Sequence, residues 1–297
     1  MKKVLITGAN SYIGVHVEKW LTRDAESYVV DTIDMLDGSW RNVDFSQYEV
    51  IFHVAGIAHA DVGSVSEEGK QLYYQVNTDL AVEVASKARE EGVKQFIFMS
   101  SMIVYSGCKE KFITSQAIPN PANFYGDSKW QADQKIRALE NHAFKVVVIR
   151  PPMIYGKNSK GNYPKLAKMA TKLPVFPVVN NKRSMLHIDN LCEFIRLMIV
   201  NEESGTFFPQ NAEYVQTSEM VKKIAQVKGH HICMLRGVGW SLKLMMKFPG
   251  KIGSLAQKAF GDSAYDMQMS EYKENYRIRN FQETIELTET NGKDEES

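Results

Sequence analysis

The sequence predicts an α/β protein built on a doubly wound parallel sheet. Short, continuous apolar runs rich in β-branched and aromatic residues occur at 4–6, 28–34, 50–55, 96–99 and 146–149, as in strands buried on both faces of a sheet. Helical patterns at 15–23, 72–91 and 125–142 lie between these runs. Alternating strands and helices imply right-handed crossovers and helices on both faces. The stretch between residues 34 and 44 is too short for a crossover helix, so we expect a loop there.

The overall composition argues against several classes of protein. Lys and Arg total 36 against 35 Asp and Glu, and a net charge of +1 gives no reason to expect a nucleic-acid partner or an anionic membrane. Cys108, Cys192 and Cys233 form no C-x-x-C pair, so we expect neither disulfides nor a metal site. We find no signal peptide and no run near the ~18 apolar residues of a transmembrane segment, which favours a cytoplasmic location.

The first predicted strand ends in a glycine turn typical of a dinucleotide site. A sharp turn from strand to helix needs glycine conformations, and a diphosphate lying against the turn needs a backbone without side chains. The helix N-terminus then offers free N–H groups to the phosphates. The series here is Gly8-x-x-Ser11-x-x-Gly14, and the predicted contacts are Gly8, Asn10, Ser11, Tyr12, Ile13 and Gly14.

An acidic residue about 20 residues beyond such a turn binds the adenosine ribose hydroxyls. Asp34 fits this spacing, and Asp31 is a second candidate. A carboxylate at this place disfavours the 2′-phosphate of NADP and therefore favours NAD. Arg41 would reverse the preference if its side chain folded back toward the ribose.

A second pattern, about a hundred residues later, indicates acid–base chemistry. Tyr125 and Lys129 are one helical turn apart, so the lysine charge can favour the phenolate of a tyrosine whose usual pKa is ~10. Ser101 follows the strand predicted at 96–99 and can donate a hydrogen bond to the oxygen being oxidised. Because ligands bind at the carboxyl edge of a parallel sheet, we predict that Ser101, Tyr125 and Lys129 are catalytic.

These motifs resemble those of the extended short-chain dehydrogenases/reductases, in the NAD-dependent epimerase/dehydratase family that acts on sugar nucleotides. The resemblance covers nearly the whole chain. It implies a Rossmann fold, an NAD cofactor with NADP also possible, and a nucleotide-sugar substrate, with a UDP-sugar favoured. It adds cofactor contacts at Asp44 and Phe45 beside adenine, at the strand-end residues His53, Ala55 and Gly56, and at Asn77, Tyr125, Lys129 and Pro152. It places Ser101, Met102, Tyr125, Met153 and Arg183 at the substrate, with Arg183 on the diphosphate.

One departure concerns the segment Arg150-Pro151-Pro152-Met153, where many members have an asparagine in place of Met153. The Arg-Pro-Pro form resembles the branch that acts on N-acetylated or 6-deoxy hexoses. The leading interpretation is a 4-epimerase of a UDP-hexose or UDP-N-acetylhexosamine that works through a transient 4-keto intermediate. Three alternatives stay open: an NAD(P)H-dependent reductase of a 4-keto sugar nucleotide, an epimerase of a polyprenyl-diphosphate-linked sugar, and a non-catalytic NAD(P)-sensing protein.

Prolines and glycines become frequent after residue 150, which indicates a second lobe. We expect residues 1–150, with 183–200 returning, to form the NAD(P)-binding Rossmann domain. Residues 151–182 and 201–285 would form a smaller C-terminal substrate lobe, and 286–297 a polar tail. Residues 240–261 mix lysines with large apolar residues, as in a helix at a membrane surface, but Pro249 and two glycines favour a helix pair of the lobe. An apolar stripe at Leu72, Val76, Leu80 and Val84 leads us to expect a homodimer, as the family implies.

Overall fold

The computed structural model describes residues 1–58, 65–246, 248 and 250–290. Its centre is a six-stranded sheet in the order β10-β6-β4-β3-β1-β2, with every pair parallel. The strands are β1 (Lys2–Thr7), β2 (Tyr28–Ile33), β3 (Val50–His53), β4 (Gln95–Met99), β6 (Lys145–Ile149) and β10 (Gly205–Phe207). The predicted fold class is confirmed. The order reverses between β1 and β3, and ligands of such sheets bind beyond the carboxyl ends of the strands at this reversal.

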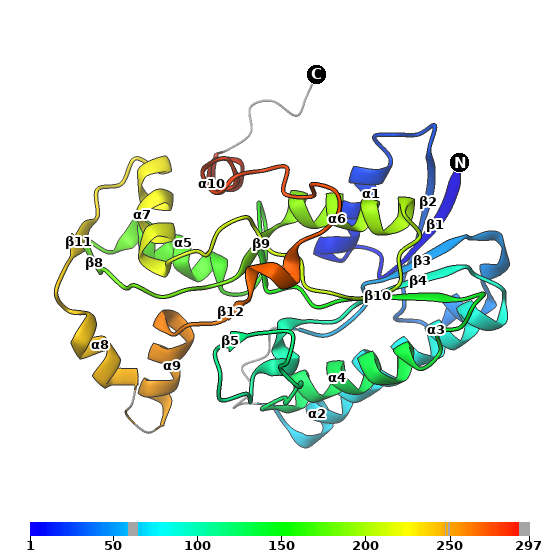
Figure 1. The fold of residues 1–297 in the computed structure, drawn as a ribbon, viewed down its shortest axis with the longest axis horizontal. Helices are drawn as coiled ribbons and strands as arrows, with labels where there is room; N and C mark the ends of the chain where they lie inside the picture. The colour runs from blue at the N-terminus through cyan, green and yellow to red at the C-terminus, as the bar shows by residue number, and fades with distance from the viewer. Residues whose placement is uncertain (59–64, 247, 249, 291–297) are drawn as a thin grey trace.

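Helices cover both faces of the sheet (Figure 1). On one face, α1 (Tyr12–Leu21) and α6 (Ile188–Val200) share an apolar core with β1 that includes Ile6, Val17 and Leu191. On the other face lie α3 (Ala81–Glu90) and α4 (Phe124–Arg137), packed over Leu5, Phe96 and other large side chains. The strands are therefore buried on both sides, which explains their continuous apolar character.

The helix predicted over 72–91 is longer and interrupted. It begins as α2 (Glu67–Tyr74), passes through the π-helical turn η3 (Gln75–Leu80) and continues as α3. The interruption divides the expected apolar stripe, because Leu72 is exposed whereas Val84 lies in the core. The predicted loop between β2 and β3 is confirmed. It holds only the short 3₁₀ turns η1 (Ser39–Asn42) and η2 (Phe45–Gln47).

A separate apolar core forms the second lobe, between α5 (Tyr163–Lys172), α7 (Thr217–Val227) and α10 (Phe281–Glu289). Two further helices, α8 (Gly239–Met246) and α9 (Lys251–Phe260), extend from it. Three small parallel sheets join the segments: β7 (Met153–Tyr155) with β9 (Met185–His187), β5 (Phe112–Ile113) with β12 (Ala264–Tyr265), and β8 (Val175–Pro177) with β11 (Cys233–Leu235).

The polar tail expected from residue 286 begins later. Helix α10 continues to Glu289, whose buried carboxylate accepts a hydrogen bond from Tyr163 Oη at 2.8 Å and pairs with Lys228 Nζ at 3.1 Å. Residues 291–297 of the predicted tail lie outside the described residues. Among the helices that the structure describes, none is both long and apolar enough to cross a bilayer.

Candidate active site

The glycine turn lies between β1 and α1, and its shape requires the residues found there. Gly8 has a φ of +115°, and a Cβ at this position would lie 2.8 Å from Ala55 N at the end of β3. Asn10 also has a positive φ, of 64°, a conformation in which asparagine is enriched. The backbone of β1 and the strand end at Ala55 therefore approach each other with no side chain between them, which leaves the surface of the turn open to a diphosphate.

Ser11, which stands where the family pattern has glycine, begins helix α1. Its hydroxyl accepts a hydrogen bond from Gly14 N at 3.1 Å and caps the helix. This cap needs glycine at 14, since a Cβ there would lie 2.6 Å from Ser11 Oγ. Because the first N–H groups of a helix lack intrahelical acceptors, those of Tyr12 and Ile13 suit phosphate oxygens. The Tyr12 hydroxyl is buried against Gly156, away from this role, and burial raises its pKa.

The adenosine side of the predicted site is formed by exposed carboxylates. Asp34 directly follows β2 and accepts a hydrogen bond from Leu36 N at 2.8 Å. Asp31, the second candidate, accepts one from Tyr48 Oη at 2.9 Å. Asp44 caps η2 and binds the backbone and hydroxyl of Ser46. Asp34 is therefore the carboxylate at the strand end, and Asp31 has a structural partner.

Three residues predicted to touch the cofactor are fully buried: Phe45, His53 and Asn77. Their side chains pack within the protein, and contact of these three residues with the cofactor stays a prediction. His53 stacks between Phe96 and Phe98 and bonds Thr7 Oγ1 through Nδ1 at 2.8 Å. Burial, together with the charge of Lys129, lowers the pKa of His53 to about 3, so it is neutral at physiological pH.

Asn77 instead holds the loop after β3. Its Oδ1 accepts from Ile57 N at 2.8 Å, and its Nδ2 donates to Ile57 O at 3.0 Å and to Ser128 Oγ at 3.2 Å. The next residue of the π-helical turn, Thr78, donates to Ser128 O at 2.7 Å. Because two consecutive side chains of η3 both reach α4, the turn fixes this helix against the loop that carries Gly56.

The three predicted catalytic residues lie together at the carboxyl edge of the sheet. Ser101 follows β4 and caps the 3₁₀ turn η4 (Met102–Tyr105), and its hydroxyl is within hydrogen-bonding reach of Tyr125. Tyr125 lies in the first turn of α4, whose N-cap Asn123 accepts from Gly126 N at 2.9 Å. One turn later, Lys129 Nζ donates to Met99 O, the last residue of β4, at 3.0 Å. The predicted serine–tyrosine–lysine set is brought together by β4 and α4.

The electrostatics of this set differ from the expectation that Lys129 lowers the pKa of Tyr125. Burial raises the Tyr125 pKa to about 12; a hydrogen bond with Ser101 opposes the shift, and the neighbouring Tyr73 adds to it. Burial also lowers the pKa of Lys129 to about 8, and its ammonium is directed at the Met99 carbonyl. The protein therefore holds Tyr125 as a protonated phenol, and deprotonation requires charge or hydrogen bonding supplied with the reactants.

Sequence reasoning missed a buried ionic network beneath helix α4. Asp133 binds Arg150 through two contacts of 2.8 Å, from Nε and Nη2, and accepts from Ser100 Oγ at 3.0 Å. Arg150 also donates to Tyr105 Oη at 2.6 Å. The available signal was helical spacing: Asp133 follows Tyr125 and Lys129 at four-residue intervals, so a carboxylate lies on the inner face of α4.

The predicted substrate residues come from three neighbouring segments. Met102 N donates to Pro151 O at 2.9 Å, which joins η4 to the Arg-Pro-Pro segment containing buried Pro152. Met153 pairs with Met185 in the small β7–β9 sheet. Arg183 lies two residues before β9 and forms isolated backbone β-bridges with Val215 and Ser263. Ser263 Oγ lies 3.7 Å from Met102 Sδ. The structure thus brings Met102, Met153 and Arg183 to adjoining segments.

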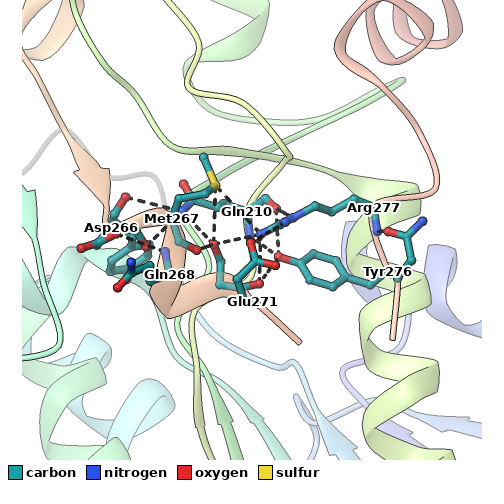
Figure 2. A network of polar contacts seen from close by, with 10 residues as sticks. Gln210, Asp266, Met267, Gln268, Glu271, Tyr276 and Arg277 are labelled. Atoms are coloured by element: carbon teal, nitrogen blue, oxygen red, sulfur yellow. Dashed lines mark hydrogen bonds and ion pairs between the residues drawn. The ribbon is translucent and has the colours of Figure 1, made fainter. Parts of the chain in front are cut away.

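The segment of Arg183 is held by a polar network around Gln210 (Figure 2). The Gln210 side chain accepts from Ser184 Oγ and donates to Ser270 Oγ at 2.9 Å. Its backbone carbonyl accepts from Tyr276 Oη at 3.0 Å and from Arg277 Nε at 3.2 Å. These contacts fix residues 270–277 against the segment that leads into β9. Arg183 itself is largely buried, which lowers its pKa, so its guanidinium lies in a setting that strengthens pairing with an anion.

Comparison with known proteins identifies relatives over most of the chain. The family model described as RmlD substrate binding domain matches residues 1–238. A UDP-glucose 4-epimerase of Vibrio cholerae is 31% identical over 276 residues, covering 84% of this chain and 83% of that protein. An N-acetyl-alpha-D-glucosaminyl-diphospho-ditrans,octacis-undecaprenol 4-epimerase of Escherichia coli O157:H7 is 28% identical over 219 residues, covering 68% of this chain and 64% of that protein.

A solved structure shares the fold. UDP-glucuronic acid 4-epimerase from Bacillus cereus, in complex with NAD, superposes with a TM-score of 0.72 at 15% identity and covers 96% of this chain and 94% of that one. The matched family model, the relatives and the glycine turn with the Ser101–Tyr125–Lys129 set lead to one conclusion: this chain belongs to the extended short-chain dehydrogenase/reductase family of NAD(P)-dependent sugar-nucleotide epimerases and reductases.

Proposed function

We propose that this protein is an NAD-dependent 4-epimerase of a UDP-linked hexose or N-acetylhexosamine. The observation that carries the proposal is the meeting of Ser101, Tyr125 and Lys129 beside the open glycine turn. The 31% identical relative from Vibrio cholerae, which spans most of both chains, supports C4 chemistry on a UDP-sugar. When bound, NAD supplies the acceptor and donor for the C4 hydride.

Each residue of the set has a role that follows from its position. Tyr125, deprotonated once the reactants are bound, would take the proton of the C4 hydroxyl. After the 4-keto sugar has turned over, it would return this proton to the C4 oxygen while C4 receives its hydride on the opposite face. Ser101, whose hydroxyl is close enough to Tyr125 to influence its pKa, steadies the oxygen that becomes the ketone. A hydrogen bond to Met99 O holds Lys129, whose charge lies on the same face of α4 as Tyr125, one turn later. Arg183 binds the substrate diphosphate.

The carboxylate beyond β2 supports NAD over NADP. Asp34 is exposed at the end of the strand, where it would meet the ribose hydroxyls and repel a 2′-phosphate. Arg41, the residue that could reverse this preference, is engaged elsewhere. Its guanidinium makes a two-point ion pair with Glu83 on α3, with distances of 2.5 and 2.6 Å.

The test is to incubate the purified protein with UDP-glucose and, separately, with UDP-N-acetylglucosamine, and to follow both C4 epimers by NMR. We expect interconversion without added cofactor, without accumulation of NADH, and with NAD(H) released from the protein on denaturation. Conversion of a 4-keto sugar nucleotide only, with one NAD(P)H oxidised per turnover, would establish a reductase instead and end the epimerase proposal.

A second candidate substrate, a polyprenyl-diphosphate-linked N-acetylhexosamine, is favoured by the relative from Escherichia coli O157:H7. The same NMR assay with a short-chain polyprenyl-diphosphate sugar decides between the two. Turnover of the lipid-linked sugar alone would replace the UDP-sugar proposal.

We also propose a homodimer through α2, η3 and α4, supported by exposed Leu72 on the helix face away from the core. Sedimentation is expected to give a dimer, and Leu72→Glu a monomer. A wild-type monomer at micromolar concentration with full activity would rule the dimer out.

A further inference from the structure

Charge is distributed very unevenly along a chain whose net charge is only +1. Residues 220–261 contain no Asp or Glu, and their basic residues are Lys222, Lys223, Lys228, Arg236, Lys243, Lys247, Lys251 and Lys258. Residues 151–182 also contain no Asp or Glu, and their basic residues are Lys157, Lys160, Lys165, Lys168, Lys172 and Lys182. Overall composition therefore conceals a strongly basic region.

These two segments fold together at one end of the molecule. They form α5, β8, α7, β11, α8 and α9, which lie at the opposite end of the long axis from β1 and β2 (Figure 1). The side chains of Lys165, Lys168 and Lys172 on α5 and of Arg236 after β11 are exposed. Although the net charge of the whole molecule is near zero, these basic side chains give this end a locally positive electrostatic potential.

The same end exposes large apolar side chains on a small sheet. In the β8–β11 pair, Val175 is the register partner of Cys233. Phe176 is buried, whereas Val175 and Leu235 are 44% and 40% exposed. Alternation along the strands puts Val175, Cys233 and Leu235 on the outer face. Arg236 directly follows, so apolar and basic groups are adjacent on this face.

Helix α8 begins four residues after β11 and continues the pattern. Leu244 is 55% exposed, Met245 is 37% exposed, and Phe248, just past the helix, is 58% exposed. Clustered exposed apolar side chains mark an interaction surface. The chain between Arg236 and Asp262 offers only positive charge to accompany them.

We infer that this end of the lobe, centred on the outer β8–β11 face and α8, attaches to the surface of an anionic phospholipid bilayer. Basic side chains bind the headgroups, and apolar side chains enter the boundary between headgroups and acyl chains. The absence of Asp and Glu over residues 220–261 is what an anionic surface requires, because any acidic residue there would be repelled. The attachment is independent of which sugar the catalytic site accepts.

The experiment is co-sedimentation of the full chain with vesicles of phosphatidylglycerol and phosphatidylethanolamine, compared with phosphatidylcholine vesicles. We expect binding to the anionic vesicles only, with loss of binding at about 1 M salt, where the screening length falls to about 3 Å. Arg236→Glu should weaken the partition on the order of tenfold, since each basic residue near an anionic surface contributes several-fold. Lys19→Glu on α1 is the charge-matched control and should bind as wild type.

The apolar contribution is tested with Leu244→Asp/Phe248→Asp, which should weaken binding to the anionic vesicles at least tenfold at low salt. Leu287→Asp on α10, a residue of similar exposure, is the control. Circular dichroism and NAD binding verify that each variant is folded. Equal binding to neutral and anionic vesicles, or no binding to either, overturns the inference. So does a wild-type oligomer, formed without vesicles, that Leu244→Asp/Phe248→Asp dissociates, because the face would then be a protein interface.

Discussion

Gly56 leaves the space that the ammonium group of Lys129 occupies. A Cβ on residue 56 would lie 2.9 Å from Lys129 Nζ and 3.0 Å from Asn77 Oδ1. Both neighbours are buried and hydrogen-bonded, Lys129 to Met99 O and Asn77 to the backbone of Ile57. Gly56, three residues after β3, thus leaves room for the position in which α4 holds Lys129.

Gly56→Ala is therefore expected to displace Lys129 and to reduce kcat on the order of tenfold, since a small misplacement in an active site has a large kinetic effect. Steady-state kinetics with the wild-type substrate measure this. Gly239→Ala is the matched control, because a Cβ there meets only Val178 O at 3.9 Å. Wild-type kcat in a folded Gly56→Ala protein would show that the position of Lys129 does not matter.

Tyr125→Phe is expected to preserve folding and NAD binding and to reduce turnover by at least ~10², the usual contribution of a positioned acid–base group. The reason is the contact of its hydroxyl with Ser101 and its place one turn before Lys129. Tyr74→Phe removes a phenol hydroxyl that binds Asp127 on the outer side of α4, and should change kcat little. Near-normal turnover by Tyr125→Phe would exclude it from the chemistry.

Arg183→Ala is expected to raise the sugar-nucleotide KM by tenfold or more while leaving the NAD affinity unchanged, because it removes a charge-assisted contact with the diphosphate. The neighbouring and exposed Lys182→Ala is the control. Substrate KM and cofactor Kd are measured separately. Weaker NAD binding with an unchanged KM would place Arg183 at the cofactor instead.

Local patterns predicted much of this architecture. A helix was predicted at 15–23 and is observed as α1 at Tyr12–Leu21, because its apolar residues Val17 and Leu21 pack on the sheet. The glycine turn and the Tyr125–Lys129 spacing were also predicted, since both depend on residues close in sequence. The burial of His53 was not predicted, because the sequence at the end of β3 does not indicate whether the His53 side chain faces the ligand edge or the helices.

Features that depend on distant partners were not predicted. The π-helical turn at 75–80 inserts into a regular helical pattern and is fixed by contacts of Asn77 and Thr78 with α4. The pairing of Asp133 with Arg150 joins α4 to the end of β6. Helical spacing puts Asp133 on the inner face of α4, but the sequence does not indicate that Arg150 is its partner. Residues 286–289, the end of helix α10, were predicted to belong to a polar tail, because the partners of Glu289, Tyr163 and Lys228, are far away in the chain.

Asp133→Asn is expected to destabilise the fold by about 3–5 kcal/mol, because it leaves the charge of buried Arg150 without its partner. Arg137 provides an internal control. It pairs with the same carboxylate at 2.9 Å but is 40% exposed, so Arg137→Gln should cost less than about 1 kcal/mol. Urea unfolding measures both. Equal losses for the two variants would contradict a special role for the buried pair.

His53 is expected to make the fold sensitive to mild acid. Its pKa is about 3 in the folded protein against 6.5 for an unperturbed histidine, because the ring is buried beside Lys129. Between these values the unfolded chain binds a proton that the folded protein does not. The contribution of His53 to the free energy of unfolding therefore falls as pH decreases through this window, by up to about 1.4 kcal/mol per pH unit.

His53→Phe keeps a ring between Phe96 and Phe98 and removes the titrating group, at the cost of the Thr7 hydrogen bond. The variant should be less stable than wild type at pH 7, and this deficit should shrink as the pH is lowered toward 5. Urea unfolding at successive pH values measures the difference, with the exposed His231→Phe as the control for replacement of a histidine by phenylalanine. If the His53→Phe and wild-type stabilities run parallel across this range, His53 is not the group that resists protonation in the folded state.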